Sequence, residues 1–230
     1  MDLAIFTGPG IYYVMKWLHF FFGVMWIGHL YYFNFTQGGF MAATDAPTKS
    51  QVQQKLLPVA MYWFRWGAMW TFVTGLLMLG LASKIGFSMS GDWGLKIMTG
   101  ALFGTLMWAN VWFLIWPKQK LIIQSAQQVA AGGSALPDLP AKAAASTLAS
   151  RTNTMFSIPM LFFMGAASHL PIQIDVSKKP IYFTVLLIVV GALQINGMKG
   201  KLGPMTTVKG VITSGFVLTA VVYGLMEVLL

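Results

Sequence analysis

Three histidines are the side chains in this apolar sequence best suited to bind a metal ion. They are His19, His29 and His169, and each lies in or at the end of a long apolar segment. A lone histidine in a membrane helix more often hydrogen-bonds to a neighbouring helix than binds a metal. His19 and His169 differ from this pattern because the predicted helices run in opposite directions and place both imidazoles at a similar depth. These two residues are therefore candidate ligands of one metal centre.

Glycines at matching distances from these two histidines indicate what kind of centre this is. Gly23 follows His19 by four residues, and Gly165 precedes His169 by four. Because positions four apart share a helix face, each histidine has a glycine one turn deeper in the membrane. A missing side chain there leaves room for a flat porphyrin. We predict one haem b per chain, with His19 and His169 as iron ligands and Gly23 and Gly165 beside the ring. The alternative is that both glycines only let helices pack closely.

A second polar site is predicted toward the other end of the helices. His29 lies ten residues beyond His19, about 15 Å along a helix, and cannot bind the same metal. Arg65 lies so deep in its segment that burying its guanidinium charge without a partner would be costly. The partner could be a carbonyl, an asparagine oxygen, a lipid phosphate or an anionic ligand. Alternatively, its side chain extends to the lipid headgroups. The candidate residues are His29, Arg65, Asn110 and Asn153, with Asn34 and Arg151 nearby.

Six long apolar segments must position these residues. The chain is 57% hydrophobic and only 9% charged, and each segment approaches the ~20 residues that span a ~30 Å hydrocarbon core. We therefore predict an all-α, polytopic membrane helical bundle, formed as a single domain over residues 1–230. Residues 119–131 are amphipathic and could either extend the third helix or lie at the membrane interface, and residues 131–140 form a flexible linker. The predicted spans are residues 11–36, 58–82, 95–116, 153–170, 180–196 and 208–230.

The distribution of charge predicts the orientation of the bundle and excludes several functions. The net charge is +9, but the lysines lie in short loops, which is unlike a nucleic-acid-binding groove. Without cysteine, the chain cannot carry a disulfide, an iron–sulfur cluster or a covalently attached c-type haem. Asp45, Asp92, Asp138 and Asp175 all lie in the predicted loops, which argues against ion-coupled transport. Nine basic residues against five place one set of loops in the cytoplasm and both termini outside. The cytoplasmic set is Lys49, Lys55, Lys118, Lys120, Lys142, Arg151, Lys199, Lys201 and Lys209; the outer set is Lys16, Lys84, Lys96, Lys178 and Lys179.

Four stretches of the sequence resemble the membrane domain of the PuuD-type, cytochrome-c-linked urate oxidases. They are Trp17–Gln37, Tyr62–Leu79, Asn110–Lys120 and Ser150–His169. The resemblance implies a multi-pass protein of the bacterial inner membrane that passes electrons to a periplasmic cytochrome c. Both termini would then be periplasmic. The sequence ends with the sixth predicted span and has no cysteine, so we expect a short form without the family's C-terminal cytochrome c domain.

Three functional hypotheses follow. The first is a membrane haem b protein that relays electrons to a periplasmic cytochrome c or a larger redox complex. The second is an oxidase or dehydrogenase of urate or another small reductant, acting with a separate cytochrome c. The third is a cofactor-free subunit of a respiratory or oxygenase complex. The expected partners are membrane lipid, the cytochrome or complex, and a second copy of the chain, but no nucleic acid.

Overall fold

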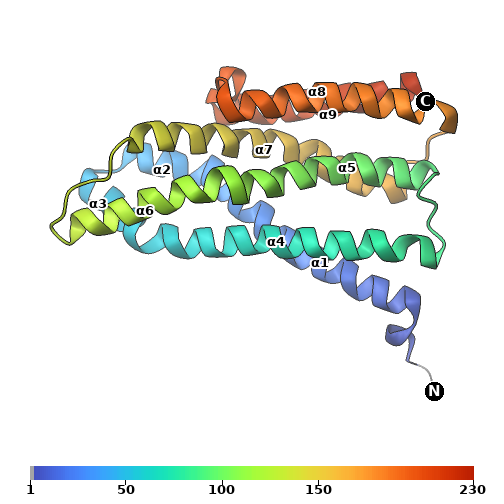
Figure 1. Cartoon of the computed structure of the whole chain (residues 1–230), viewed down its shortest axis with the longest axis horizontal. Coiled ribbons are helices and arrows are strands. Elements are labelled where there is room, and N and C mark those ends of the chain that lie inside the picture. Colours follow the sequence, from blue (N-terminus) through green and yellow to red (C-terminus); the bar gives the residue numbers. More distant parts are fainter. Residues whose placement is uncertain (1–2) are drawn as a thin grey trace.

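A computed structural model describes residues 3–230. All regular secondary structure in this range is helical. The predicted all-α class is therefore confirmed. The long helices alternate in direction, and the start of α1 and the end of α9 lie at the same end of the bundle (Figure 1). The helices are α1 Gly8–Tyr31, α2 Gly38–Ala43, α3 Ala46–Gln51, α4 Leu57–Ala82, α5 Asp92–Ala109, α6 Trp116–Ala130, α7 Leu139–His169, α8 Lys179–Lys199 and α9 Val208–Leu229.

Three of the junctions between these helices are π-helical, so that several labelled helices form longer continuous rods. Tyr32–Gln37 joins α1 to α2, Val52–Leu56 joins α3 to α4, and Asn110–Ile115 joins α5 to α6. The predicted extension of the third helix over residues 119–131 is confirmed, because α6 continues α5 to Ala130. Short π-helical insertions often occur at functional sites, because the extra residue in the turn redirects the side chains that follow it.

Helix α7 lies at the centre of three tiers, with α1 and α4 on one side and α8 and α9 on the other (Figure 1). It packs against α5, α6, α8 and α9. Its inner side chains include buried Thr152, Asn153, Thr154 and Ser157. A helix surrounded by protein can hold such residues because its neighbours, rather than lipid, supply their hydrogen bonds.

Four long helical stretches are long and apolar enough to cross a membrane: Ala46–Ile85, Asp92–Ala130, Val176–Lys199 and Val208–Leu229. The rod of α1 and α2 and the central helix α7 are not among them. Large apolar side chains such as Phe21, Leu77, Ile188 and Val217 are nevertheless exposed around the bundle. An apolar outer surface of this extent is suited to lipid. The chain is a membrane protein.

Lys96 corrects one sequence prediction, because it is fully buried rather than exposed in an outer loop. Its ammonium group lies 2.7 Å from the Asp92 carboxylate, one turn earlier on α5. It also donates a hydrogen bond to the carbonyl of Leu170, which follows the last residue of α7. The buried charge is therefore paired, and it ties the start of α5 to the end of α7.

Candidate functional site

His19 is held by α4 in an orientation typical of a metal ligand. Its Nδ1 lies 3.2 Å from Oγ1 of Thr74. The Thr74 hydroxyl donates its hydrogen to a backbone carbonyl, that of Trp70 at 2.7 Å or that of Thr71 at 3.1 Å. In the tautomer with the hydrogen on Nδ1, the Thr74 oxygen accepts from His19. This leaves the lone pair of Nε2 free. Metal-binding histidines are commonly fixed in this way, with one ring nitrogen donating to the protein and the other facing the metal.

The glycine that contacts the His19 ring is Gly75 of α4. A Cβ atom added to Gly75 would lie 3.2 Å from Cε1 of His19, which is tighter than most Cβ contacts in proteins, so the ring would have to shift slightly. Gly23, which is predicted to lie beside the porphyrin ring, has more room. A Cβ there would meet only the methyl group of Thr71, at 3.9 Å. Gly75 therefore seats the imidazole, while Gly23 leaves space beside it. Sequence spacing within one helix could not identify a contact made from α4.

His169 is the last residue of α7 and is exposed. The next residue, Leu170, is fixed through its carbonyl by Lys96. A Cβ at Gly165 would meet no atom within 4 Å, so open space lies beside this glycine as well. The start of α1 and the end of α7 lie at the same end of the bundle (Figure 1). The imidazole nitrogens of His19 and His169 are donors of the kind that bind haem iron, so these residues fit a haem. That the two histidines bind the same iron stays a prediction.

His29 hydrogen-bonds within its own helix. Its Nδ1 lies 2.7 Å from the carbonyl of Met25, one turn earlier. The ring is half-buried, and its centroid lies 6.3 Å from that of Phe33. This bond fixes the imidazole against α1 and also leaves Nε2 free.

Asn110 and Asn153, two of the candidate residues of the second polar site, hydrogen-bond to each other in a network that joins three helical rods. Asn110 Nδ2 donates to Asn153 Oδ1 at 2.8 Å and to Gln194 Oε1 at 3.0 Å. Gln194 of α8 returns a bond to Asn110 Oδ1 at 2.6 Å, and Asn153 donates to the carbonyl of Met107 at 2.9 Å. Since these amides satisfy one another, the network holds the bundle together.

Arg65 lies apart from this amide network, against tryptophan rings. Its guanidinium carbon is 4.0 Å from the ring centroid of Trp116 and 5.9 Å from that of Trp112. A guanidinium above an indole face is stabilised by the ring's negative face. The π-helical segment Asn110–Ile115 carries Trp112 and leads directly into Trp116. This partner is one that sequence analysis did not consider for Arg65.

A cavity of about 200 Å³ lies near these residues, between the π-helical segment Tyr32–Gln37 with α2, and α4, α6 and α7. Two polar atoms of its lining residues are buried without a hydrogen-bond partner among residues 3–230: Oε1 of Gln37 and Nη1 of Arg151. Asn34 donates to Ser150 at 2.8 Å, and Gln119 donates to Ser146 at 2.9 Å, so the other polar walls are fixed. The polar lining residues are Asn34, Gln37, Gln119, Ser146, Thr147, Ser150 and Arg151.

Sequence analysis placed Asn34 and Arg151 near a polar site but missed the others. Ser146 and Ser150 lie four residues apart on α7, with Asn153 three further on. This spacing places all three side chains near one face of a helix, and it could have identified Ser146 and Ser150 as members of the polar site. Gln37 carries no such signal, because the π-helical turn from Tyr32 to Gln37 shifts the side-chain positions from those of an α-helix.

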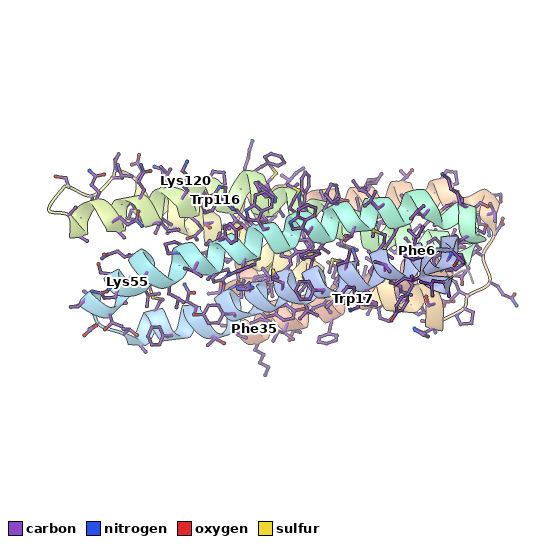
Figure 2. All side chains as sticks on the ribbon, turned by 90° about the horizontal axis from the view of Figure 1, so that it is seen from below. Phe6, Trp17, Phe35, Lys55, Trp116 and Lys120 are labelled. Carbon is purple, nitrogen blue, oxygen red and sulfur yellow. The ribbon has the colours of Figure 1, made fainter. Side chains whose placement is uncertain are left out.

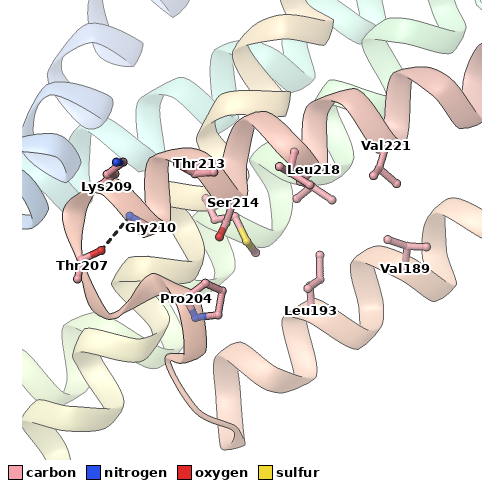
Figure 3. Close-up of a pocket in the computed structure, with 12 residues that line it drawn as sticks. Val189, Leu193, Pro204, Thr207, Lys209, Gly210, Thr213, Ser214, Leu218 and Val221 are labelled. Carbon is pink, nitrogen blue, oxygen red and sulfur yellow. Dashed lines mark hydrogen bonds between the residues drawn. The ribbon is translucent and has the colours of Figure 1, made fainter.

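A larger cleft of about 650 Å³ separates α8 from α9 (Figure 3). Val189 and Leu193 face Leu218 and Val221 across it. Its one charged lining residue is Lys209, at the end where Thr207 caps α9 by accepting a 2.9 Å bond from Gly210 N–H. The cleft is suited to apolar contacts rather than to chemistry.

Comparison with known proteins gives one family. The family model described as "Urate oxidase N-terminal" matches residues 86–223, more than half of the chain. The match includes His169, Arg151 and the amide network, whereas His19, Arg65 and Gln37 precede it. Neither a curated protein nor a solved structure matches the chain.

Proposed function

Because the chain belongs to the urate oxidase N-terminal family, we propose that it is a membrane haem b redox protein serving urate-related oxidation. His19 and His169 are the proposed iron ligands, with Gly23 and Gly165 beside the porphyrin. A bound haem supplies reversible one-electron transfer between ferric and ferrous iron. The protein relays these electrons toward a periplasmic cytochrome c or a larger redox complex of the bacterial inner membrane.

The observation that carries this proposal is the orientation of His19. Its Nδ1–H is committed to Thr74, and its ring rests on Gly75. Both contacts come from α4, so the free Nε2 keeps its direction without a metal. At the other ligand, the Lys96 ammonium holds the backbone immediately after His169. Neutral imidazoles fixed by their surroundings are the ligands that a low-spin haem requires.

The experiment is an absorption spectrum of the purified protein, oxidised and then reduced, with haem quantified as its pyridine haemochrome. We expect about one haem b per chain and a sharp reduced α band. Protein purified from a haem-sufficient host with no haem would instead favour a cofactor-free structural subunit.

A second candidate function is oxidation of urate itself, or of another small reductant, with a separate cytochrome c as electron acceptor. The family assignment favours it, and so does a cavity lined by Arg151, whose Nη1 atom is buried without a hydrogen-bond partner among residues 3–230. Urate and a purified cytochrome c supply the test. Reduction of the cytochrome that depends on both urate and the protein would identify an oxidase. A protein that only exchanges electrons with the cytochrome would be a relay.

A further inference from the structure

The cleft between α8 and α9 lies between two helices that are each seated on α7. A Cβ atom added to Gly197 of α8 would lie 2.6 Å from Oγ1 of Thr152. One added to Gly215 of α9 would lie 3.0 Å from the carbonyl oxygen of Met155. Thr152 and Met155 both belong to α7, so these glycines bring the backbones of α8 and α9 close to it. Because α7 sets both positions, the two helices leave a cleft of about 650 Å³ between them.

The chemical groups along the α9 wall of this cleft change in a definite order (Figure 3). Lys209 lies in the first turn of α9. The hydroxyl residues Thr213 and Ser214 follow about 6–8 Å farther along the helix. The apolar residues Val217 and Val221 follow at about 12 and 18 Å. A phospholipid has the same order of groups, from a charged phosphate through esters that accept hydrogen bonds to apolar acyl chains.

The apolar part of the cleft is continuous with the outer surface of the bundle. Helices α8 and α9 lie in two of the stretches that are long and apolar enough to cross a membrane. Val217 and Val221 line the cleft and are 57% and 46% exposed. Water does not fill an apolar space of this kind, because it would lack hydrogen-bond partners there. An acyl chain that enters from the surrounding bilayer supplies the missing van der Waals contacts.

The charge near the start of α9 favours an anionic headgroup. Residues 199–214 contain Lys199, Lys201 and Lys209 but no acidic residue. Glu227, the acidic residue of α9, lies about 27 Å farther along the helix than Lys209. Basic side chains clustered beside the end of a membrane helix attract anionic lipids.

The same charge argues against a second copy of this chain as the occupant of the cleft. Copies inserted into one membrane share an orientation, so symmetric pairing through the cleft would bring the lysines of residues 199–214 against their equivalents. Like charges repel at such distances. An anionic phospholipid instead neutralises them.

We propose that the cleft between α8 and α9 binds one anionic phospholipid, with its phosphate at Lys209 and an acyl chain along Val217 and Val221. The hydroxyl groups of Thr213 and Ser214 lie at the depth of the lipid esters and donate to their carbonyl oxygens. The lipid thereby joins α8 to α9 on the side where α7 leaves them apart. The site does not depend on the haem proposal, because no histidine lines it.

Native mass spectrometry of the delipidated protein, titrated with single lipids in a neutral detergent, tests this proposal. Phosphatidylglycerol and phosphatidylcholine with identical acyl chains are compared, because both contain a phosphate but only the first carries a net negative charge. We expect the wild type to bind one phosphatidylglycerol about 5-fold or more tightly than phosphatidylcholine. Lys209→Gln should weaken phosphatidylglycerol binding about 5-fold and leave phosphatidylcholine binding unchanged.

Lys120→Gln is the matched control. It removes one exposed positive charge at the end of the bundle opposite Phe6, the end where α9 also begins (Figures 1 and 2), but it does not line the cleft. This variant should keep the preference for phosphatidylglycerol. Val221→Trp fills the apolar part of the cleft and should weaken the binding of both lipids alike. Circular dichroism checks that each variant keeps its helical content.

Two results would overturn the headgroup contact: equal affinity of the wild type for the two lipids, or equal losses of phosphatidylglycerol binding in Lys209→Gln and Lys120→Gln. Unchanged lipid binding in Val221→Trp would overturn the acyl-chain contact. A wild-type dimer that dissociates in Val221→Trp, with lipid binding unchanged, would identify a second copy as the occupant and overturn the proposal as a whole.

Discussion

Replacing Lys96 by methionine should destabilise the bundle far more than removing an exposed lysine. Lys96 is fully buried, lies 2.7 Å from Asp92, and also donates to the Leu170 carbonyl. Methionine keeps most of the volume but removes both interactions. Breaking a buried ion pair costs about 3–5 kcal/mol, since the remaining charge loses its partner. The Asp92 side chain is 28% exposed, so water relieves part of that cost, and we expect about 3 kcal/mol.

The pair of Lys178 and Asp175 is the matched control. It also joins a lysine to a nearby aspartate, at 3.7 Å, but the side chains are 54% and 47% exposed. Exposed pairs contribute about 0–1 kcal/mol, so Lys178→Met should have little effect. The measurement is the free energy of reversible unfolding in mixed micelles.

Hydrogen exchange provides a local test of the same contact. The Ile172 amide, which lies 3.4 Å from the Asp92 carboxylate, should lose protection in Lys96→Met but not in Lys178→Met. If the two variants unfold within about 1 kcal/mol of each other, Lys96 does not hold the end of α7 as described.

Other predictions concern the tryptophan cluster, the amide network and the topology. Arg65→Lys should lower the free energy of unfolding by about 1 kcal/mol, because lysine loses the planar stacking on Trp116; an unchanged value would mean that the stacking contributes nothing. Asn110→Leu should lower it by about 2 kcal/mol by leaving neighbouring amides unpaired, and a stabilised variant would contradict that network. Engineered cysteines at Lys142 and Asp175 should react with a membrane-impermeant label from opposite sides, and labelling from one side would refute a membrane-crossing α7.

The hydrophobic pattern of the sequence predicts the helical class and the central parts of the six long helices. It does not predict their ends. The fourth predicted span begins at residue 153, whereas α7 begins at Leu139. The polar residues near the start of α7 suggested a loop, but Gln119 and Asn34 satisfy them from neighbouring helices. Hydropathy records the cost of burying a polar group, and it contains no information on the partner that removes this cost.

The same limitation explains which parts of the candidate site were found. The Asn110–Asn153 contact was predictable because buried amides in adjacent spans need partners. Gln194, the third member of the network, lies 41 positions after Asn153 in the sequence, and nothing local connects the two. The seat of His19 on Gly75 likewise depends on the packing of α1 against α4. Residue type thus indicated candidate chemistry, while tertiary packing determined which side chains meet.

Haem content in single-histidine variants tests the proposed redox site directly. Purified wild type, His19→Ala, His169→Ala and His29→Ala would be compared by reduced-minus-oxidised spectra and pyridine haemochrome. We predict that His19→Ala and His169→Ala each lose haem or become high-spin, because each removes one of the two iron ligands. His29→Ala should keep the low-spin spectrum. Loss of haem in His29→Ala with a normal spectrum in His19→Ala would contradict the assignment.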